Sequence, residues 1–430
     1  MNPSAETRQA QRHLRTLISA GHETQERSKA HSVETPAHSK PARRVLVFSH
    51  AMSRNGASLL LLQMLRWLKQ HGNFQIDVVS DGHGPLVEDF RAIASVTIVS
   101  SMPYPIRLLP SRWARPVASA WLRAKLRALT LGRRYDLVYA NTAAVWPYVA
   151  ALGDRPPPLI WHIHELPYAL GLTLPDDGAR GALRAANRVV AVSRAVAQAL
   201  SSGYAVRPEC IDQIYGFVPD EAPSLAIRAE LRAKVRHQLG LPEDAFVVGG
   251  CGGLGWRKGT DLFLQIARLA QRADGAQRVH FLWVGGAQCG SPEAMQFDFD
   301  VKQLGLEAVC CRVPATADVS AYYCAMDAFA LTSREDPFPL VALEAATHRL
   351  PVVCFAMAGG TPEFVAGDAG RVVPYLNLTA FVAALRELAC QPELGARLGE
   401  AGRQRVLREH SIDAQGPRLL RSVERCLEAA

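Results

Sequence analysis

Two acids stand where an apolar run gives way to a helical pattern. The run Ala328–Thr332 is typical of a buried parallel strand, and Asp336 and Glu344 come after it. Open α/β sheets bind ligands at the carboxyl ends of their strands. Free N–H groups at a helix start near Leu340 and Val341 would suit an anion such as a diphosphate. One acid can then reach beyond the phosphates while the other reaches back toward a sugar. The alternative is a solvated capping acid and an ordinary helix Glu.

A glycine-rich loop with two cations comes after another apolar run. The run Ala245–Cys251 is predicted to be a strand, and the loop Gly252–Gly259 after it carries Arg257 and Lys258. Two cations beside a helix start can neutralise a diphosphate. The glycine spacing around Lys258 is not that of a Walker loop. The alternative is a pair of exposed basic residues in a turn.

A third polar group ends a strand in the first half of the chain. Strand alternation places His162 and His164 on one face, with Glu165 next to them. The sequence offers no third cluster of metal ligands, so a metal site is disfavoured. A histidine that donates a hydrogen bond to a substrate hydroxyl and a structurally satisfied histidine both remain open.

Glycines mark two further loops. Gly56 ends the loop that begins at His50, where it allows close backbone approach or simply makes a tight turn. Gly359 and Gly360 precede Glu363 and would let a sugar or phosphate lie on bare backbone. Glu363 is also well placed as an ordinary acid at the start of the next helix.

Strands and helices alternate in two series, which predicts α/β architecture with two parallel sheets in tandem. Pro339 suits a first helical position, where its missing N–H would be unpaired anyway. The predicted strands are 44–49, 74–80, 95–100, 136–140, 158–163 and 188–192, then 245–251, 279–284, 328–332 and 350–355. The predicted divisions are a disordered extension 1–42, a first domain 43–220, a second domain 221–399 and a C-terminal helix 400–430 that could pack back on the first domain.

The composition is that of a soluble globular protein. The chain has 430 residues, of which 49% are hydrophobic and 20% charged, and its net charge of +8 indicates an anionic partner. We expect no transmembrane helix, because no apolar run is long enough, and no signal peptide. Nine cysteines without metal-type spacing are expected to be reduced thiols, which favours the cytoplasm.

The stretch 106–134 is basic, with apolar residues between its cations. Such a segment can lie on an anionic membrane, which would make the protein peripheral at the inner membrane face, or it can be a solvated helix face. Pro105, Pro110 and Pro116 are expected to break any long helix at its start. No nucleic-acid recognition module is recognisable, so no nucleic-acid partner is expected.

Several motifs in order resemble those of the retaining glycosyltransferases of family 4. The resemblance covers most of 44–425, and the motifs are Gly-Trp-Arg-Lys-Gly-Thr-Asp261, Phe-Leu-Trp-Val-Gly-Gly286, Ser-Arg-Glu-Asp-Pro-Phe-Pro-Leu-Val-Ala-Leu-Glu344-Ala and Gly-Gly-Thr-Pro-Glu363. It implies a GT-B fold, in which two Rossmann-like domains face each other across a cleft. The first domain would bind the acceptor and the second a nucleotide-sugar donor.

The resemblance also implies roles by position. Asp336, where the family has Glu, would contact a hydroxyl of the donor sugar, and Glu344 would bind the ribose. His164 would be the active-site histidine, with His162 as second choice. Gly56 and His162 would lie on the acceptor side, and the catalytic set would be His164, Asp336 and Lys258. The donor-binding set would be Arg257, Lys258, Asp336, Phe338, Leu340, Val341, Glu344, Gly359 and Gly360. Two departures are Gly253 in place of an Arg, for which Arg257 can substitute, and Pro339 in place of a common Gly.

The implied reaction moves a sugar from a UDP- or GDP-sugar to a saccharide or lipid-linked acceptor, without a metal or other cofactor. Synthesis of cell-surface polysaccharide or glycolipid is the expected setting. The leaving phosphate can accept the acceptor's proton, so no dedicated base is needed. A non-catalytic nucleotide-sugar-binding protein and a GT-B epimerase are the alternatives. A phosphorylase is disfavoured, because no pyridoxal-phosphate lysine site is evident.

Overall fold

The computed structural model describes residues 42–107, 109–153, 156–174, 176–272, 279–286, 290–316 and 318–428. The predicted N-terminal extension 1–42 lies outside these residues except for its last position. Both sheets of the structure belong to one compact unit that begins at Ala42. No helix in these ranges is long and apolar enough to cross a membrane.

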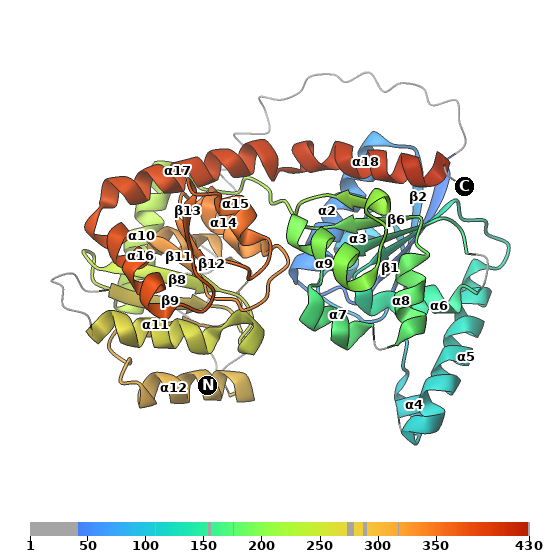
Figure 1. The fold of residues 1–430 in the computed structure, drawn as a ribbon, viewed down its shortest axis with the longest axis horizontal. Coiled ribbons are helices and arrows are strands. Elements are labelled where there is room, and N and C mark those ends of the chain that lie inside the picture. The colour runs from blue at the N-terminus through green and yellow to red at the C-terminus, as the bar shows by residue number, and fades with distance from the viewer. Residues whose placement is uncertain are drawn as a thin grey trace. The chain divides into compact units, whose positions relative to one another are not determined.

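The first half of the chain forms a parallel sheet of seven strands in the order β3-β2-β1-β4-β5-β6-β7 (Figure 1). Its central strands are wholly buried and mostly apolar, as expected for a sheet covered by helices on both faces. The strands are β1 Arg43–Ser49, β2 Phe74–Ser80, β3 Ser95–Ile98, β4 Leu137–Asn141, β5 Leu159–Ile163, β6 Arg188–Ala191 and β7 Ile211–Gln213. The helices are α2 Gly56–His71, α3 Val87–Arg91, α4 Tyr104–Arg107, α5 Ser111–Thr130, η1 Ala143–Val145, α6 Trp146–Ala151, α7 Pro167–Thr173, α8 Asp177–Arg184, α9 Arg194–Tyr204 and η2 Pro208–Cys210.

The second half forms a parallel sheet of six strands in the order β10-β9-β8-β11-β12-β13. Two parallel Rossmann-like sheets therefore succeed one another along the chain, as predicted. The strands are β8 Phe246–Cys251, β9 Val279–Val284, β10 Cys310–Val313, β11 Ala328–Leu331, β12 Val352–Phe355 and β13 Gly370–Val373. The helices are α10 Leu225–Leu239, η3 Trp256–Lys258, α11 Thr260–Arg272, α12 Pro292–Gln303, α13 Ser320–Ala325, α14 Leu340–Thr347, α15 Thr361–Val365, α16 Leu378–Cys390, α17 Pro392–Glu409 and α18 Ile412–Glu428.

Three strands, β7, β10 and β13, were not predicted from the sequence. Each is only three or four residues long and lies at the edge of its sheet. Edge strands are partly exposed, so their sequences lack the continuous apolar run that marks a central parallel strand. The fourth edge strand, β3, was predicted all the same, because its Val-Thr-Ile sequence is rich in β-branched residues.

Two predictions about proline were wrong. Pro339 is the N-cap of α14 with an extended backbone, and Leu340 is the first helical residue. Pro116 does not break the basic segment, because α5 runs from Ser111 to Thr130 with this proline inside it. One absent N–H in the second turn removes a single helical hydrogen bond, which the packed face of α5 outweighs.

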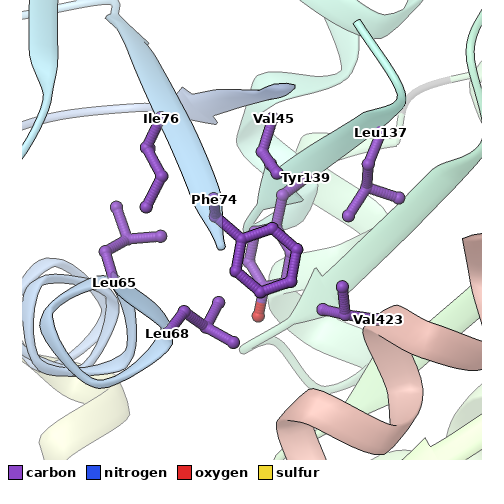
Figure 2. A pocket seen from close by; sticks show the side chains of 8 residues that line it. All are labelled: Val45, Leu65, Leu68, Phe74, Ile76, Leu137, Tyr139 and Val423. Atoms are coloured by element: carbon purple, nitrogen blue, oxygen red, sulfur yellow. The ribbon is translucent and has the colours of Figure 1, made fainter. Parts of the chain in front are cut away.

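The last helix returns to the first half of the chain. Figure 1 shows α18 alongside α2. Val423 of α18 faces Leu65, Leu68 and Phe74 around a small apolar cavity, drawn in Figure 2. The cavity is lined by core side chains, so we interpret it as a packing feature.

Two segments pass between the halves side by side. The Val218 N–H donates a backbone hydrogen bond to the His410 carbonyl, with a nitrogen–oxygen distance of 3.1 Å. His410 Nδ1 in turn lies 3.3 Å from the Gly216 carbonyl oxygen. Burial lowers the pKa of His410 to about 4, so the ring is neutral at physiological pH. The outgoing and returning segments are thus bonded to each other.

We expect Gly416→Ala to lower the free energy of unfolding by about 1–3 kcal/mol, the usual cost of overpacking. A Cβ atom at Gly416 would lie 2.4 Å from Cε2 of the Trp67 ring on α2. Gly395→Ala on α17 is the matched control, because nothing lies within 4 Å of its added Cβ. Urea denaturation of both variants measures the difference. Equal stability of the two variants would contradict the packing of α18 on α2.

Candidate functional site

A buried ion pair joins two strand-end loops of the second half. Lys258 closes η3 after β8, and its Nζ donates to Asp336 Oδ2 at 2.6 Å. Ser333 Oγ donates to the same oxygen at 3.2 Å. The Asp336 side chain is only 7% exposed, so these bonds replace those that water would make to its carboxylate. Two residues predicted to share a site are therefore in direct contact.

Arg257 lies on the rim of this pair. Its Nη1 donates to the Glu335 carbonyl at 3.0 Å and is 3.9 Å from Asp336 Oδ1. Its side chain is 40% exposed, which leaves the guanidinium in reach of a ligand. Because Asp336 already accepts from Lys258, an incoming diphosphate would have to share or take over that ammonium.

The loop with Gly359 and Gly360 lies directly against Asp336. The Asp336 N–H donates to the Ala358 carbonyl at 2.7 Å, and Asp336 and Gly359 form an isolated parallel bridge. A Cβ at Gly359 would lie 1.8 Å from the Asp336 carbonyl oxygen, and its φ of +132° is a glycine conformation. Packing within the protein thus already requires this glycine. A sugar or phosphate contact at Gly359 and Gly360 stays a prediction.

Glu344 lies on α14 and bonds to a tyrosine. Tyr323 Oη donates to Glu344 Oε2 at 3.0 Å. Burial raises the pKa of Glu344, and the hydrogen bond from Tyr323 partly opposes this. The carboxyl group is held in one orientation by a partner that the sequence did not suggest. Its predicted contact with ribose hydroxyls is not tested by these bonds.

The start of α14 faces the first half of the chain. A Cβ at Gly56 would be 3.8 Å from the side chain of Leu340, and one at Gly216 would be 3.0 Å from it. Phe338 packs against Tyr215, with ring centroids 5.1 Å apart. Gly56 and the segment Phe338–Val341 are therefore brought together, although Phe338 and Leu340 use their side chains for packing. The N–H groups of Leu340 and Val341 belong to the first turn of α14.

His164 is held by the neighbouring strand. Its Nε2 and Asn141 Oδ1 are 2.8 Å apart, so the ring donates to the amide oxygen. Burial lowers the pKa of His164 to about 3, and the nearby His50 adds to the effect. Thr142, the next residue after Asn141, has a φ of +78°, a costly conformation for a β-branched residue. A neutral imidazole at a strained strand end is consistent with a site histidine.

His162 is wholly buried beside it. The two histidine ring centroids are 4.0 Å apart, which confirms the prediction that both lie on one face. Tyr139 Oη and His162 Nδ1 are 2.8 Å apart, and burial lowers the pKa of His162 well below its usual value. Its Nε2 is buried without a hydrogen-bond partner, so the structure satisfies only one of the two ring nitrogens of His162. Among the described residues, no group of three His, Cys, Asp or Glu side chains is arranged to hold a metal.

Glu165 ties the ends of β4 and β5 together. Its Oε1 accepts from the Ala143 N–H at 3.0 Å and its Oε2 from the His164 N–H at 2.9 Å. Burial raises the pKa of Glu165 to about 7, while these bonds and the charge of Arg257 oppose the rise.

Two acids beside the predicted site have unforeseen partners. Glu335 accepts from the N–H groups of Tyr168 and Ala169, and Glu363 accepts from those of Arg194 and Ala195. One of the two interpretations of this loop made Glu363 an ordinary acid of the helix at whose start it lies, but its bonds go to α9 of the first half. Adjacency to Asp336 was the one sequence signal that could have pointed to Glu335.

Comparisons with known proteins agree over both halves. A family model described as glycosyl transferases group 1 matches residues 232–405, and one described as glycosyltransferase family 4 matches 54–222. A "D-inositol 3-phosphate glycosyltransferase 1" of Catenulispora acidiphila is 26% identical over 78% of this chain and 83% of its own length. A "D-inositol 3-phosphate glycosyltransferase" of Saccharomonospora viridis is 31% identical over 51% of this chain and 54% of its own length.

A solved structure shows the same fold. Anabaena Alr3699/HepE, in complex with UDP and glucose, superposes with a TM-score of 0.72 at 21% identity. The match covers 88% of this chain and 99% of that one. The two-sheet fold of this chain is therefore shared with the Anabaena structure.

We expect His164→Asn to make the free energy of unfolding depend less steeply on pH below pH 6.5. A neutral buried histidine takes up its proton only on unfolding, so its contribution is present above pH 6.5 and is lost as pH falls toward 3. Each such group adds a slope of up to about 1.4 kcal/mol per pH unit. Urea denaturation of wild type and variant between pH 4 and pH 6 measures the difference. Parallel profiles would show that His164 titrates normally in the folded state.

Proposed function

Because this chain belongs to the glycosyl transferases of group 1, we propose that it transfers a hexose from a UDP- or GDP-sugar to an acceptor hydroxyl with retention of anomeric configuration. Glycosyl transfer is the activity of the family. The donor class, the stereochemistry and the site residues are the proposed part. The UDP and glucose bound to the Anabaena protein support a uridine nucleotide sugar as the first donor to test.

The observation that carries the proposal is the contact between Lys258, Arg257 and Asp336. Breaking the anomeric carbon–oxygen bond leaves negative charge on the departing diphosphate. Lys258 and Arg257 can neutralise that charge at fixed positions, which is how preorganised electrostatics lowers a barrier. Asp336 lies against the same ammonium, where it can accept a hydrogen bond from a donor-sugar hydroxyl. These cations supply the charge neutralisation for which other transferases use a metal, so we propose transfer without one.

The first half supplies uncharged polar groups. His164 carries one proton at physiological pH and is oriented by Asn141. Because its one N–H donates to Asn141, its Nδ1 can accept a hydrogen bond from a sugar hydroxyl without adding charge near the developing oxocarbenium ion. We propose that the leaving phosphate takes the acceptor's proton, in keeping with this neutral histidine. Gly56 leaves room beside Leu340 for a ligand to approach.

For the acceptor we propose chemical classes and not a single compound. Saccharides and lipid-linked saccharides of the cell surface remain the leading class. The names of the two curated relatives add a phosphorylated cyclic polyol as a second class to test. An acceptor with a phosphate would agree with the net charge of +8.

Lys258→Ala is expected to lower turnover about 10²- to 10³-fold, the effect of losing one oxyanion donor. Release of nucleotide from a panel of UDP-, GDP- and ADP-sugars, with saccharide and inositol-phosphate acceptors, measures it. Lys302→Ala, on the exposed face of α12, is the matched control. Unchanged turnover for Lys258→Ala would contradict the phosphate role. Donor binding by the wild type without any release would favour the non-catalytic alternative.

We also propose that α4 and α5 contact an anionic membrane surface. The sequence has no Asp or Glu between Asp89 and Asp136. Trp113 is 57% exposed and Leu131 is 83% exposed, while Leu122 and Leu126 bury the opposite side of α5. Exposed aromatic and aliphatic groups among cations are typical of an interfacial helix. Figure 1 shows α4 and α5 extending from the sheet of the first half.

Replacing Arg123, Lys125 and Arg127 with Gln is expected to weaken vesicle binding by about a hundredfold or more at low salt, at roughly 1 kcal/mol per cation. All three residues are exposed on α5. Arg397, Arg408 and Arg418 replaced together with Gln form the control, because they are exposed on α17 and α18 and change the net charge equally. Co-sedimentation with phosphatidylglycerol vesicles measures both. Equal loss in the control would show an effect of net charge alone, and no binding by wild type would end this proposal.

A further inference from the structure

Two carboxylates of the second half form the N-terminal caps of two helices in the first half. We propose that Glu335 and Glu363 are positioning residues, which hold the acceptor-side half against the donor-side half in the arrangement that allows transfer. This inference rests on the proposed function for its account of donor and acceptor sides. It assigns a role to residues that the proposed chemistry does not use.

Glu363 makes more hydrogen bonds to the first half than Glu335 does. Its Oε2 accepts from the Arg194 N–H at 3.0 Å and its Oε1 accepts from the Ala195 N–H at 2.8 Å. Tyr215 Oη donates to Oε2 at 3.0 Å, and Arg194 Nε is 3.3 Å from the same oxygen. The side chain of Glu363 is only 11% exposed, so solvent weakens these bonds little.

The first turn of α9 has two N–H groups that its own N-cap residue does not bond. Its own N-cap, Ser193, accepts from the Val196 N–H and leaves the first two N–H groups of the helix without a local partner. Glu363 accepts from those two groups. An anion at this position is also favoured by the helix dipole. Separation of the halves would therefore break both bonds, and the carboxylate and the two N–H groups would then have to bond to water instead.

Glu335 makes the second contact in the same way. Its Oε2 accepts from the Tyr168 N–H at 3.0 Å and its Oε1 lies 3.3 Å from the Ala169 nitrogen, both in the first turn of α7. The rings of Tyr168 and Trp256 pack 5.2 Å apart and support the contact. Trp256 belongs to the same turn as Lys258.

Each capping acid is next to a predicted donor-contact residue. Glu335 immediately precedes Asp336, and Glu363 lies three residues after Gly360. A Cβ at Gly360 would lie 2.6 Å from Ser193 Cβ, so only glycine lets this loop approach the start of α9 so closely. The loops proposed to bind the donor are thus the same loops that contact the first half. Donor position and acceptor-side position are consequently fixed by the same short segments.

The test compares Glu335→Gln, Glu363→Gln, the double variant and Glu363→Ala. Gln keeps one acceptor oxygen but loses the charge, so the effect should increase from Gln to Ala. We call molecules closed when the two halves keep these contacts and open when they do not. Loss of a helix cap costs about 1 kcal/mol, which changes the ratio of closed to open molecules by up to about tenfold. We expect kcat to fall about tenfold in each single variant and further in the double variant. Glu293→Gln, exposed on α12, is the matched control.

Two other readouts separate positioning from folding and from donor binding. The affinity for UDP, measured by calorimetry, should stay within about threefold of wild type, because the groups proposed to hold it lie on the second half. The radius of gyration from small-angle X-ray scattering should rise in the variants and not in the Glu293→Gln control.

An unchanged radius of gyration together with unchanged kcat would overturn the inference, as would a loss of UDP affinity with kcat unchanged at saturating donor. If the radius of gyration rises in the variants but the wild type transfers no sugar, the inference that these acids hold the halves together stands and the proposed function fails. The two failures are therefore distinguishable.

Discussion

The pairing of Lys258 with Asp336 is the interaction on which the arrangement of the second half depends. A carboxylate that is nearly removed from water must be neutralised, and the ammonium at 2.6 Å does so. The pair joins the loop after β8 to the loop after β11, two neighbouring strands of the sheet. The backbone of Asp336 then bonds to Ala358 beyond β12, so three successive strand ends are tied at one point. Loops joined in this way can present charge to a ligand without first reorganising.

Charge is divided unequally between the halves at this place. Arg257 and Lys258 supply positive charge on the donor side, whereas burial keeps His162 and His164 neutral on the other side. Glu165 adds a carboxyl group whose pKa is raised to about 7, close to the point at which it loses its charge. This asymmetry fits a reaction in which a diphosphate departs toward one side while an uncharged hydroxyl approaches from the other.

Continuous patterns in the sequence made the middle of each sheet predictable. Central strands such as β1, β5 and β8 were recognisable from their apolar runs. Lys258 and Asp336 were expected at one site because parallel strands end at a common edge, but their ion pair was not predicted. Of the four edge strands, β3 was predicted, whereas β7, β10 and β13 were missed because their short, half-exposed sequences carry no such run. The partners of Glu363 lie 168 and 169 positions away, and no local pattern specifies the direction of a side chain across that separation. Asn141 and Tyr323 were missed for the same reason, since each orients a site residue from a different element.

The bonded pair of segments at Val218 and His410 has a mechanical consequence. One covalent connection would let two bodies swivel freely, but two adjacent connections joined by hydrogen bonds resist torsion and still permit bending. Relative movement of the two halves that keeps these bonds is therefore limited to bending at this pair of segments. Small displacements near His410 would be magnified at the far ends of both sheets, so a mutation there could slow turnover without touching any reacting atom.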